Sequence, residues 1–278
     1  MKAIKLFMAI ASMLVAGVSC AQKIDAPKTK ALVVYYSQTS NTKTVAQEIA
    51  NHLGADIKEI QAVKPYDGDF QATISRSMKD RQEGVLPEIK PLDVDFSNYD
   101  VIFLGYPIWF GTYAPPVETF LEQVDLSGKK IVPFCTFGSG GLDSSVKDLS
   151  ARQPKADILP GYGVRAARLK AVPQEVDQFL KAGGFIKGEY TQLAPFPEQH
   201  AVSAEESAIF DKAVGDYPMI HAKAETVAQR AIPGGIEYLF TAKDTPRDGG
   251  QNMPPAGPMK VYVIVLNGQA PEFTQVVR

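Results

Sequence analysis

The chain has 278 residues, of which 45% are hydrophobic and 22% are charged, and its formal net charge is −2. This hydrophobic fraction is ample for a packed core, so a disordered or fibrous protein is not expected. Two cysteines cannot build a disulfide framework, and a slightly acidic chain lacks the strongly basic face that nucleic-acid binding requires. The length allows one large domain or two smaller ones.

The start of the chain, residues 1–21, is typical of an export signal. Two lysines precede an apolar run that ends in small residues, which is the order found in secretory signal peptides. Cleavage before Gln22 is one outcome. Lipid attachment to Cys20 is the other, although Gly17 stands where bacterial lipoprotein signals usually carry a bulky residue. In both cases we expect an exported protein, either periplasmic or lipid-anchored to the bacterial envelope, with no transmembrane span in the mature chain.

Residues 28–188 alternate strand-like and helical patterns. The predicted elements are strands at 31–36, 56–60, 101–105, 130–137 and 156–159, and helices at 42–53, 70–82, 116–124, 143–151 and 174–182. The continuous apolar runs at 31–36 and 101–105 are typical of parallel strands buried on both faces. This alternation predicts an α/β domain in which helices cover both faces of a parallel sheet.

Beyond a linker at residues 189–202 the pattern changes. The predicted elements are a helix at 204–214, strands at 235–242, 259–266 and 272–277, a loop at 244–258, and a segment at 219–227 that is ambiguous between helix and strand. The Asn267-Gly268 pair between two strand-like runs predicts a hairpin. We therefore expect a small α+β domain over residues 203–278. Residues 28–188 carry no net charge, whereas residues 189–278 carry −4.

The segment between the first strand and the first helix is rich in hydroxyls. At the carboxyl end of a parallel strand, backbone N–H groups and the start of the next helix form an anion-binding concavity. Ordinary helix capping would need one hydroxyl, and the chain has no glycine-rich dinucleotide motif or phosphate-loop lysine. We expect a single terminal phosphate to be bound here by Ser37, Thr39, Ser40, Asn41 and Thr42.

The segment Gly105–Tyr113 follows the buried strand at 101–105 and contains the only tryptophan. Aromatic side chains at the end of a sheet are candidates for stacking on a flat ring system. The alternative is a hydrophobic plug over the edge of the sheet. The candidate residues are Tyr106, Pro107, Trp109, Phe110, Gly111 and Tyr113.

A glycine-rich segment follows the strand at 130–137. Glycines let the backbone approach a ligand closely, although a plain flexible loop would have the same composition. The candidate residues are Thr136, Phe137, Gly138 and Gly140.

These three segments follow strands that we expect to lie side by side, where doubly wound sheets bind their ligands. Residues 28–188 resemble the flavodoxin-like FMN-binding family. The Ser-x-Thr-x-Asn-Thr pattern at 37–42 matches its phosphate loop, Pro107, Trp109 and Gly111 match its first flavin loop, and residues 136–140 match its second. The resemblance implies a five-stranded sheet in the order 2-1-3-4-5. It also implies non-covalently bound FMN, with Trp109 or Tyr113 stacked on the isoalloxazine ring.

The resemblance leaves the reaction open. Electron-carrying flavodoxins are usually strongly acidic, which steers them to basic partners, whereas residues 28–188 are charge-balanced. This favours an FMN-dependent reductase of a quinone or a nitro compound over a diffusible electron carrier, although NAD(P)H is not expected outside the cytoplasm. The sequence identifies no catalytic residue and no redox partner.

Residues 203–278 are faintly similar to cystatin-like domains. Cystatins carry Gln-x-Val-x-Gly in a bend that enters papain-type proteases, and the corresponding stretch here is Gln229–Gly234. Ala231 stands at the valine position, and Ile232-Pro233 intrude before the glycine. The alternative function is therefore an interaction protein that uses this domain to engage a protease or an envelope partner, with the flavodoxin-like unit as a scaffold.

Other candidate residues are interpreted structurally. Three dispersed histidines give no metal signal. Cys135 falls inside a predicted buried strand, where a thiol is inert. The basic run Arg76, Lys79 and Arg81 is interpreted as the solvated face of a helix.

Overall fold

The computed structural model describes residues 30–245 and 257–278, apart from residues 68, 216 and 219. The expected signal peptide lies outside the described residues. Within them, no helix is both long enough and apolar enough to cross a membrane.

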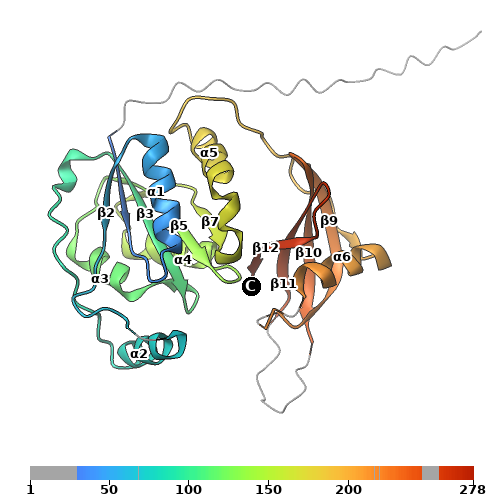
Figure 1. The fold of residues 1–278 in the computed structure, drawn as a ribbon, viewed down its shortest axis with the longest axis horizontal. Helices are drawn as coiled ribbons and strands as arrows, with labels where there is room; N and C mark the ends of the chain where they lie inside the picture. The colour runs from blue at the N-terminus through green and yellow to red at the C-terminus, as the bar shows by residue number, and fades with distance from the viewer. Residues whose placement is uncertain (1–29, 68, 216, 219, 246–256) are drawn as a thin grey trace, which may run out of the picture.

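The first domain is built on a parallel sheet (Figure 1). Its order is β2 (Asp56–Glu59), β1 (Ala31–Tyr35), β3 (Val101–Trp109), β5 (Lys130–Phe137) and β6 (Asp157–Ile158). A further strand, β7 (Tyr162–Arg165), pairs with β5 in parallel beyond the end of β6. Since β6 and β7 share the fifth place, the expected order 2-1-3-4-5 is confirmed.

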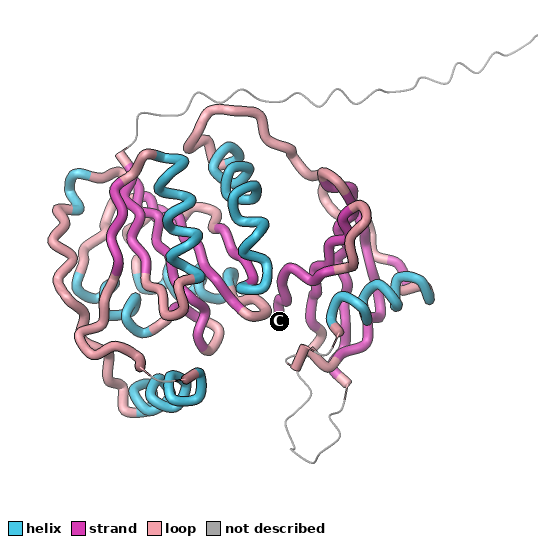
Figure 2. The backbone as a smooth tube through the Cα atoms, in the orientation of Figure 1, coloured by secondary structure: helices cyan, strands magenta, loops and turns pink. Residues whose placement is uncertain are grey.

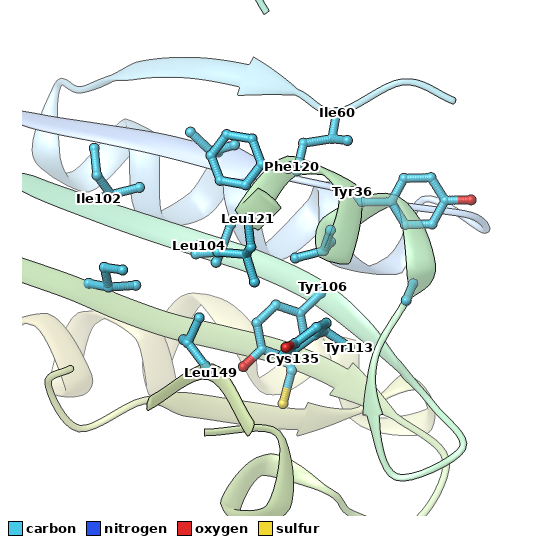
Figure 3. Packing of buried hydrophobic residues seen from close by; sticks show 14 of the residues in the cluster. Tyr36, Ile60, Ile102, Leu104, Tyr106, Tyr113, Phe120, Leu121, Cys135 and Leu149 are labelled. Atoms are coloured by element: carbon cyan, nitrogen blue, oxygen red, sulfur yellow. The ribbon is translucent and has the colours of Figure 1, made fainter. Parts of the chain in front are cut away.

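Helices cover both faces of this sheet. On one face, α1 (Asn41–Leu53) and α5 (Val172–Ala182) pack on Val33 and Phe103. On the other face lie α3 (Pro115–Gln123) and α4 (Leu142–Arg152), and Figure 3 shows the core that they share with the sheet. The remaining helix, α2 (Phe70–Gln82), lies beyond the carboxyl ends of the strands, and two short 3₁₀ helices are formed by Phe96–Asn98 and Ala166–Ala171.

In the first domain, two strands differ from the sequence-based expectation. The fifth strand is interrupted after Ile158 by Pro160 and Gly161, and its second half was not predicted. The strand predicted at 101–105 continues to Trp109 and turns back into β4 (Thr112–Tyr113), with which it pairs in antiparallel fashion. The aromatic segment is therefore the tip of a β-hairpin rather than an irregular loop.

The C-terminal region forms a separate antiparallel sheet with one helix. The strand order is β12 (Glu272–Val277), β11 (Met259–Leu266), β10 (Gly235–Asp244), β9 (Ala222–Ile232) and β8 (His200–Ala201). The helix α6 (Ala204–Val214) buries Phe210 against Phe240 on one face of this sheet. The segment that was ambiguous at 219–227 belongs largely to β9. Part of the loop expected at 244–258 lies outside the described residues.

The linker crosses from α5 to the second sheet (Figure 2), and its later part packs on that sheet. Phe196 packs edge-on against Tyr262, and the guanidinium of Arg230 lies 4.2 Å from the centre of the Phe196 ring. The side chain of Gln199 accepts hydrogen bonds from Thr226 and Thr241. The linker is therefore part of the packing of the C-terminal sheet.

Candidate functional site

The three candidate segments meet because they follow β1, β3 and β5, which are neighbours in the sheet. Tyr36 donates a backbone hydrogen bond of 3.0 Å to Gly105, joining the first segment to the second. The hydroxyl oxygens of Thr42 and Thr136 lie 2.9 Å apart, joining the first to the third. Both threonines are buried, so this contact fixes the start of α1 against the end of β5.

The first segment presents its backbone N–H groups without protein acceptors. Ser40 adopts a left-handed conformation with φ of 64°, and its side chain makes no capping hydrogen bond to α1. The hydroxyl of Ser37 accepts a 3.2 Å hydrogen bond from the backbone N–H of Lys43. Among the residues that the structure describes, the backbone N–H groups of residues 38–42 have no hydrogen-bond acceptor. Together with the exposed Thr39 and Ser40, they form a concave donor array suited to an anion.

The β3–β4 hairpin presents Trp109, the last residue of β3, beside that array. The Trp109 ring makes edge-to-face contacts with Tyr36 at 6.1 Å and with Tyr66 at 5.1 Å between ring centres. The tip of the hairpin is formed by Phe110 and Gly111, both with positive φ, and Phe110 is 48% exposed. The structure therefore places one partly exposed indole and the open backbone of a tight turn next to the phosphate-type site.

The other aromatic candidates belong to the core. Tyr106 is fully buried, donates to or accepts from Ser145 at 3.2 Å, and packs edge-on against Tyr113. Figure 3 shows both rings beside Cys135, within the cluster covered by α3 and α4. Phe137 is also buried in this cluster. Tyr113 lies in this core cluster and also lines a cavity beside Trp109, so its stacking on a flavin stays a prediction.

Two polar side chains connect the first segment to the loop before α2. The Tyr36 hydroxyl donates to Gln38, whose amide donates to the backbone carbonyl of Tyr66 at 2.5 Å. Arg76 lies 4.0 Å from the centre of the Tyr66 ring and donates to the carbonyl of Pro65. Arg76 is therefore a structural contact of this loop, which corrects its interpretation as part of a solvated helix face.

Tyr36 and Tyr66 stay protonated in this setting. Burial, together with the nearby Asp80, raises the pKa of Tyr66 to about 12. Burial also raises the pKa of Tyr36. Both phenols are therefore neutral at physiological pH and bring no negative charge to the site. Burial likewise raises the pKa of the Cys135 thiol, so a reactive thiolate is not available there.

A cavity of about 450 Å³ opens between α2 and the β3–β4 hairpin. Its walls include Arg81, Trp109, Phe110 and Thr112. The Thr112 hydroxyl is buried and has no hydrogen-bond partner among the described residues. The cavity thus combines aromatic surface with the cation of Arg81 and with three carboxylates, from Asp80, Glu118 and Glu122.

The glycine-rich segment contacts the C-terminal sheet. The carbonyl of Gly138 accepts a 2.8 Å hydrogen bond from Arg165, and the carbonyl of Ser139 accepts a 2.6 Å hydrogen bond from the backbone N–H of Val276. Sequence reasoning missed both contacts. Arg165 lies in a strand that was not predicted, and contact between two domains leaves no local sequence pattern.

This donor set fits a flat ligand that ends in a phosphate. The unpaired amides and small hydroxyls suit the phosphate, and Trp109 with the exposed turn at Gly111 suits the ring system. Within the described part of the chain, no group of three or more His, Cys, Asp or Glu side chains could hold a metal ion.

Comparisons with known proteins agree with this geometry. The flavodoxin family profile matches residues 30–177, which is more than half of the chain. A solved structure of a candidate flavoprotein from Bacteroides eggerthii is 28% identical, with a TM-score of 0.50, over 55% of this chain and 97% of that one.

Two curated relatives match over shorter stretches. An NAD(P)H dehydrogenase (quinone) of Gluconacetobacter diazotrophicus is 30% identical over 100 residues, covering 34% of this chain and 46% of that protein. An uncharacterised protein of Methanocaldococcus jannaschii is 30% identical over 110 residues, covering 39% of this chain and 55% of that protein. The chain thus spans about half the length of these relatives. None of these matches addresses the cystatin-like resemblance of residues 203–278, which stays a prediction.

The sheet order, the three loops at its carboxyl edge and the match over residues 30–177 lead to one conclusion: the chain belongs to the flavodoxin family, whose cofactor is FMN.

Proposed function

We propose that this protein is an exported FMN-dependent reductase of a small electron acceptor such as a quinone. The observation that carries the proposal is the array of unpaired backbone N–H groups at residues 38–42, beside Trp109 and joined to β5 through Thr42 and Thr136. Such an array binds a phosphomonoester without a cation, which is the part of FMN that riboflavin lacks.

Each part of the site has a defined task. The amides of residues 38–42 and the hydroxyls of Thr39 and Ser40 would hold the phosphate, while Trp109 would lie against the isoalloxazine. The backbone of residues 110–111 and 138–140 would face the edge of that ring. When bound, FMN supplies reversible transfer of two electrons and their protons. The phenols of Tyr36 and Tyr66 are neutral and therefore add no negative charge to this region.

The choice of a small acceptor over a protein partner rests on charge and shape. Residues 28–188 carry no net charge, so long-range steering toward a basic redox protein is weak. The cavity beside Trp109 is of a size that accommodates a small ring compound. The partial match to an NAD(P)H dehydrogenase (quinone) supports the same class of substrate.

A first experiment tests the cofactor. The protein as purified should show flavin absorbance bands, or acquire them after incubation with FMN, and should bind riboflavin far more weakly. Thr39→Asp places a negative charge at the exposed mouth of the amide array and should abolish FMN binding. The matched variant Thr191→Asp, at an exposed position near α5, should bind FMN normally. A colourless protein that does not take up FMN would overturn the proposal.

A second experiment tests the reaction and its location. With FMN bound, the protein should reduce a water-soluble quinone at the expense of NADH or NADPH, and Thr39→Asp should not. Reduction of a protein acceptor but of no quinone would favour the electron-carrier interpretation. Fractionation of expressing bacteria, with the mass of the mature N-terminus, tests export and decides between cleavage before Gln22 and a lipid on Cys20.

A further inference from the structure

The glycine-rich flavin loop is held from outside its own domain. Besides the hydrogen bond from Val276 to the Ser139 carbonyl, Gly140 lies directly against β12. A Cβ atom on Gly140 would come within 2.1 Å of the Val276 carbonyl oxygen. The backbones of the loop and of β12 are thus in close contact, and only glycine permits this approach.

Arg165 connects the loop and β12 through one side chain. Its Nε donates to the Gly138 carbonyl at 2.8 Å, and its Nη1 donates to the Phe273 carbonyl at 3.0 Å. The guanidinium also lies 3.4 Å from the centre of the Phe273 ring. Arg165 is buried, and a planar guanidinium can serve both carbonyls at once, which a lysine ammonium on a flexible stem cannot do equally well.

Two further contacts reinforce this interface. Arg168 forms ion pairs with Glu175 of α5 and with Glu272 at the start of β12. Burial alone would lower the pKa of Arg168, but the two carboxylates raise it above its ordinary value and keep the side chain charged. The hydroxyl of Tyr217 lies 2.6 Å from the position that a Cβ atom on Gly138 would take. The C-terminal domain thus reaches every part of the loop from Gly138 to Gly140.

We propose that the C-terminal domain is a working part of the FMN site: β12 and Arg165 hold residues 138–140 in their flavin-binding conformation, so that FMN binding and docking of this domain stabilise each other. The inference rests on the proposed binding of FMN. Arg165 is a positioning residue here, since it acts through the loop. Because coupling between two binding events is reciprocal, the effect must be measurable in both directions.

Hydrogen exchange of the full-length protein tests the first direction. Saturating FMN should slow exchange in the peptide covering 272–278, while the peptide covering 235–242 in the same sheet should change little. The peptide covering 37–45 reports FMN binding itself. Protection at 37–45 without protection at 272–278 would overturn the coupling. Protection at neither would instead contradict the proposed function.

Substitution of Arg165 tests the other direction. Arg165→Lys should weaken FMN binding at least about tenfold, within the usual range of coupling between sites. Arg230→Lys is the matched control, because Arg230 also donates to a backbone carbonyl and lies against an aromatic ring, but on β9 at the far side of the sheet. Arg230→Lys should leave the FMN affinity within about twofold of that of the unmodified protein. Equal affinities in both variants would overturn the role of Arg165.

Gly140→Ala provides a test that leaves Arg165 itself unchanged. The added methyl group must push β12 away from the loop, so FMN affinity should fall and exchange at 272–278 should become fast and insensitive to FMN. If Arg165→Lys unfolds the protein, this variant decides the question alone. An FMN affinity and an exchange pattern like those of the unmodified protein would overturn the proposal.

Discussion

The hydroxyls of Thr42 and Thr136 lie 2.9 Å apart, although 94 residues separate them in the sequence. Thr42 lies in the first turn of α1, just after the phosphate-type loop, and Thr136 lies near the end of β5, just before the glycine-rich segment. One buried hydrogen bond thus sets the spacing between the two ends of the FMN site.

Removal of this hydrogen bond should destabilise the protein. Thr42→Val keeps the side-chain shape but leaves the buried Thr136 hydroxyl unpaired, so we expect the free energy of unfolding to fall by about 1–3 kcal/mol. Thr42→Ser retains the hydroxyl and should lose less. Chemical denaturation of the FMN-free protein measures both, and equal stability of Thr42→Val and the unmodified protein would contradict this role.

Trp109 should contribute to FMN affinity through its ring. Trp109→Ala should weaken FMN binding by about 1–2 kcal/mol, by analogy with other aromatic contacts. Trp109→Phe keeps an aromatic surface and should lose less affinity. Fluorescence titration with FMN measures the dissociation constants. Unchanged affinity in Trp109→Ala would shift the stacking role to Phe110 or Tyr113, which line the same cavity.

Gly105 should be irreplaceable for steric reasons. A Cβ atom at this position would lie 2.1 Å from Cζ of Phe134, a fully buried ring in the neighbouring strand. We expect Gly105→Ala to lower the free energy of unfolding by about 1–3 kcal/mol, because the added methyl group overpacks the core. Gly257→Ala is the control, because no described residue lies within 4 Å of the added methyl group. Thermal unfolding of the two variants measures the difference in their stability. Equal stability of Gly105→Ala and Gly257→Ala would show that Phe134 moves aside and would contradict the prediction.

The start of α6 should make stability depend on pH. Ser203 and Glu206 cap each other, and the hydrogen bonds from Ser203 lower the pKa of Glu206 below its ordinary value of 4.5, with a smaller contribution from His200. A carboxylate with a lowered folded-state pKa contributes stability that is present above about pH 4.5 and is lost as the pH falls through the folded-state value.

Ser203→Ala should therefore lower the free energy of unfolding by about 1 kcal/mol at pH 7, the usual cost of removing an N-cap. The loss of unfolding free energy caused by Ser203→Ala should become smaller below pH 4.5, because protonated Glu206 no longer accepts both hydrogen bonds from Ser203. Urea denaturation at several pH values measures this trend. A deficit of the same size at pH 3 and pH 7 would show that the carboxylate does not contribute.

Much of the fold is predictable because its signals are local. The apolar run at 31–36 and the helical spacing that ends at Gly54 specify β1 and α1, and the Asn267-Gly268 pair specifies the last hairpin. Strand β7 escaped prediction because it is short and begins just after Pro160 and Gly161. The predicted bounds of β5, 130–137, are those observed, but the sequence of β5 does not indicate that two short strands rather than one pair along it.

The site was predictable only in part, for a related reason. Hydroxyl-rich and glycine-rich loops can be recognised from the sequence, so the phosphate-type loop and the flavin-type loop were predictable. Which aromatic side chains enter the core depends on how the hairpin at Trp109 folds back, and this sent Tyr106 and Tyr113 inward. The roles of Arg165 and Val276 depend on contact between distant segments, which no spacing rule encodes.

The position of Gln199 has a practical consequence for dissecting the protein. Its side chain accepts from Thr226 and Thr241 and donates to the Leu239 carbonyl, so it ties together β9 and β10. A C-terminal fragment that starts at residue 203 would lack the hydrogen bonds of Gln199 and the edge strand β8. Any truncated form intended to assay protease inhibition should begin before residue 193, so that a negative result reflects recognition rather than a damaged sheet.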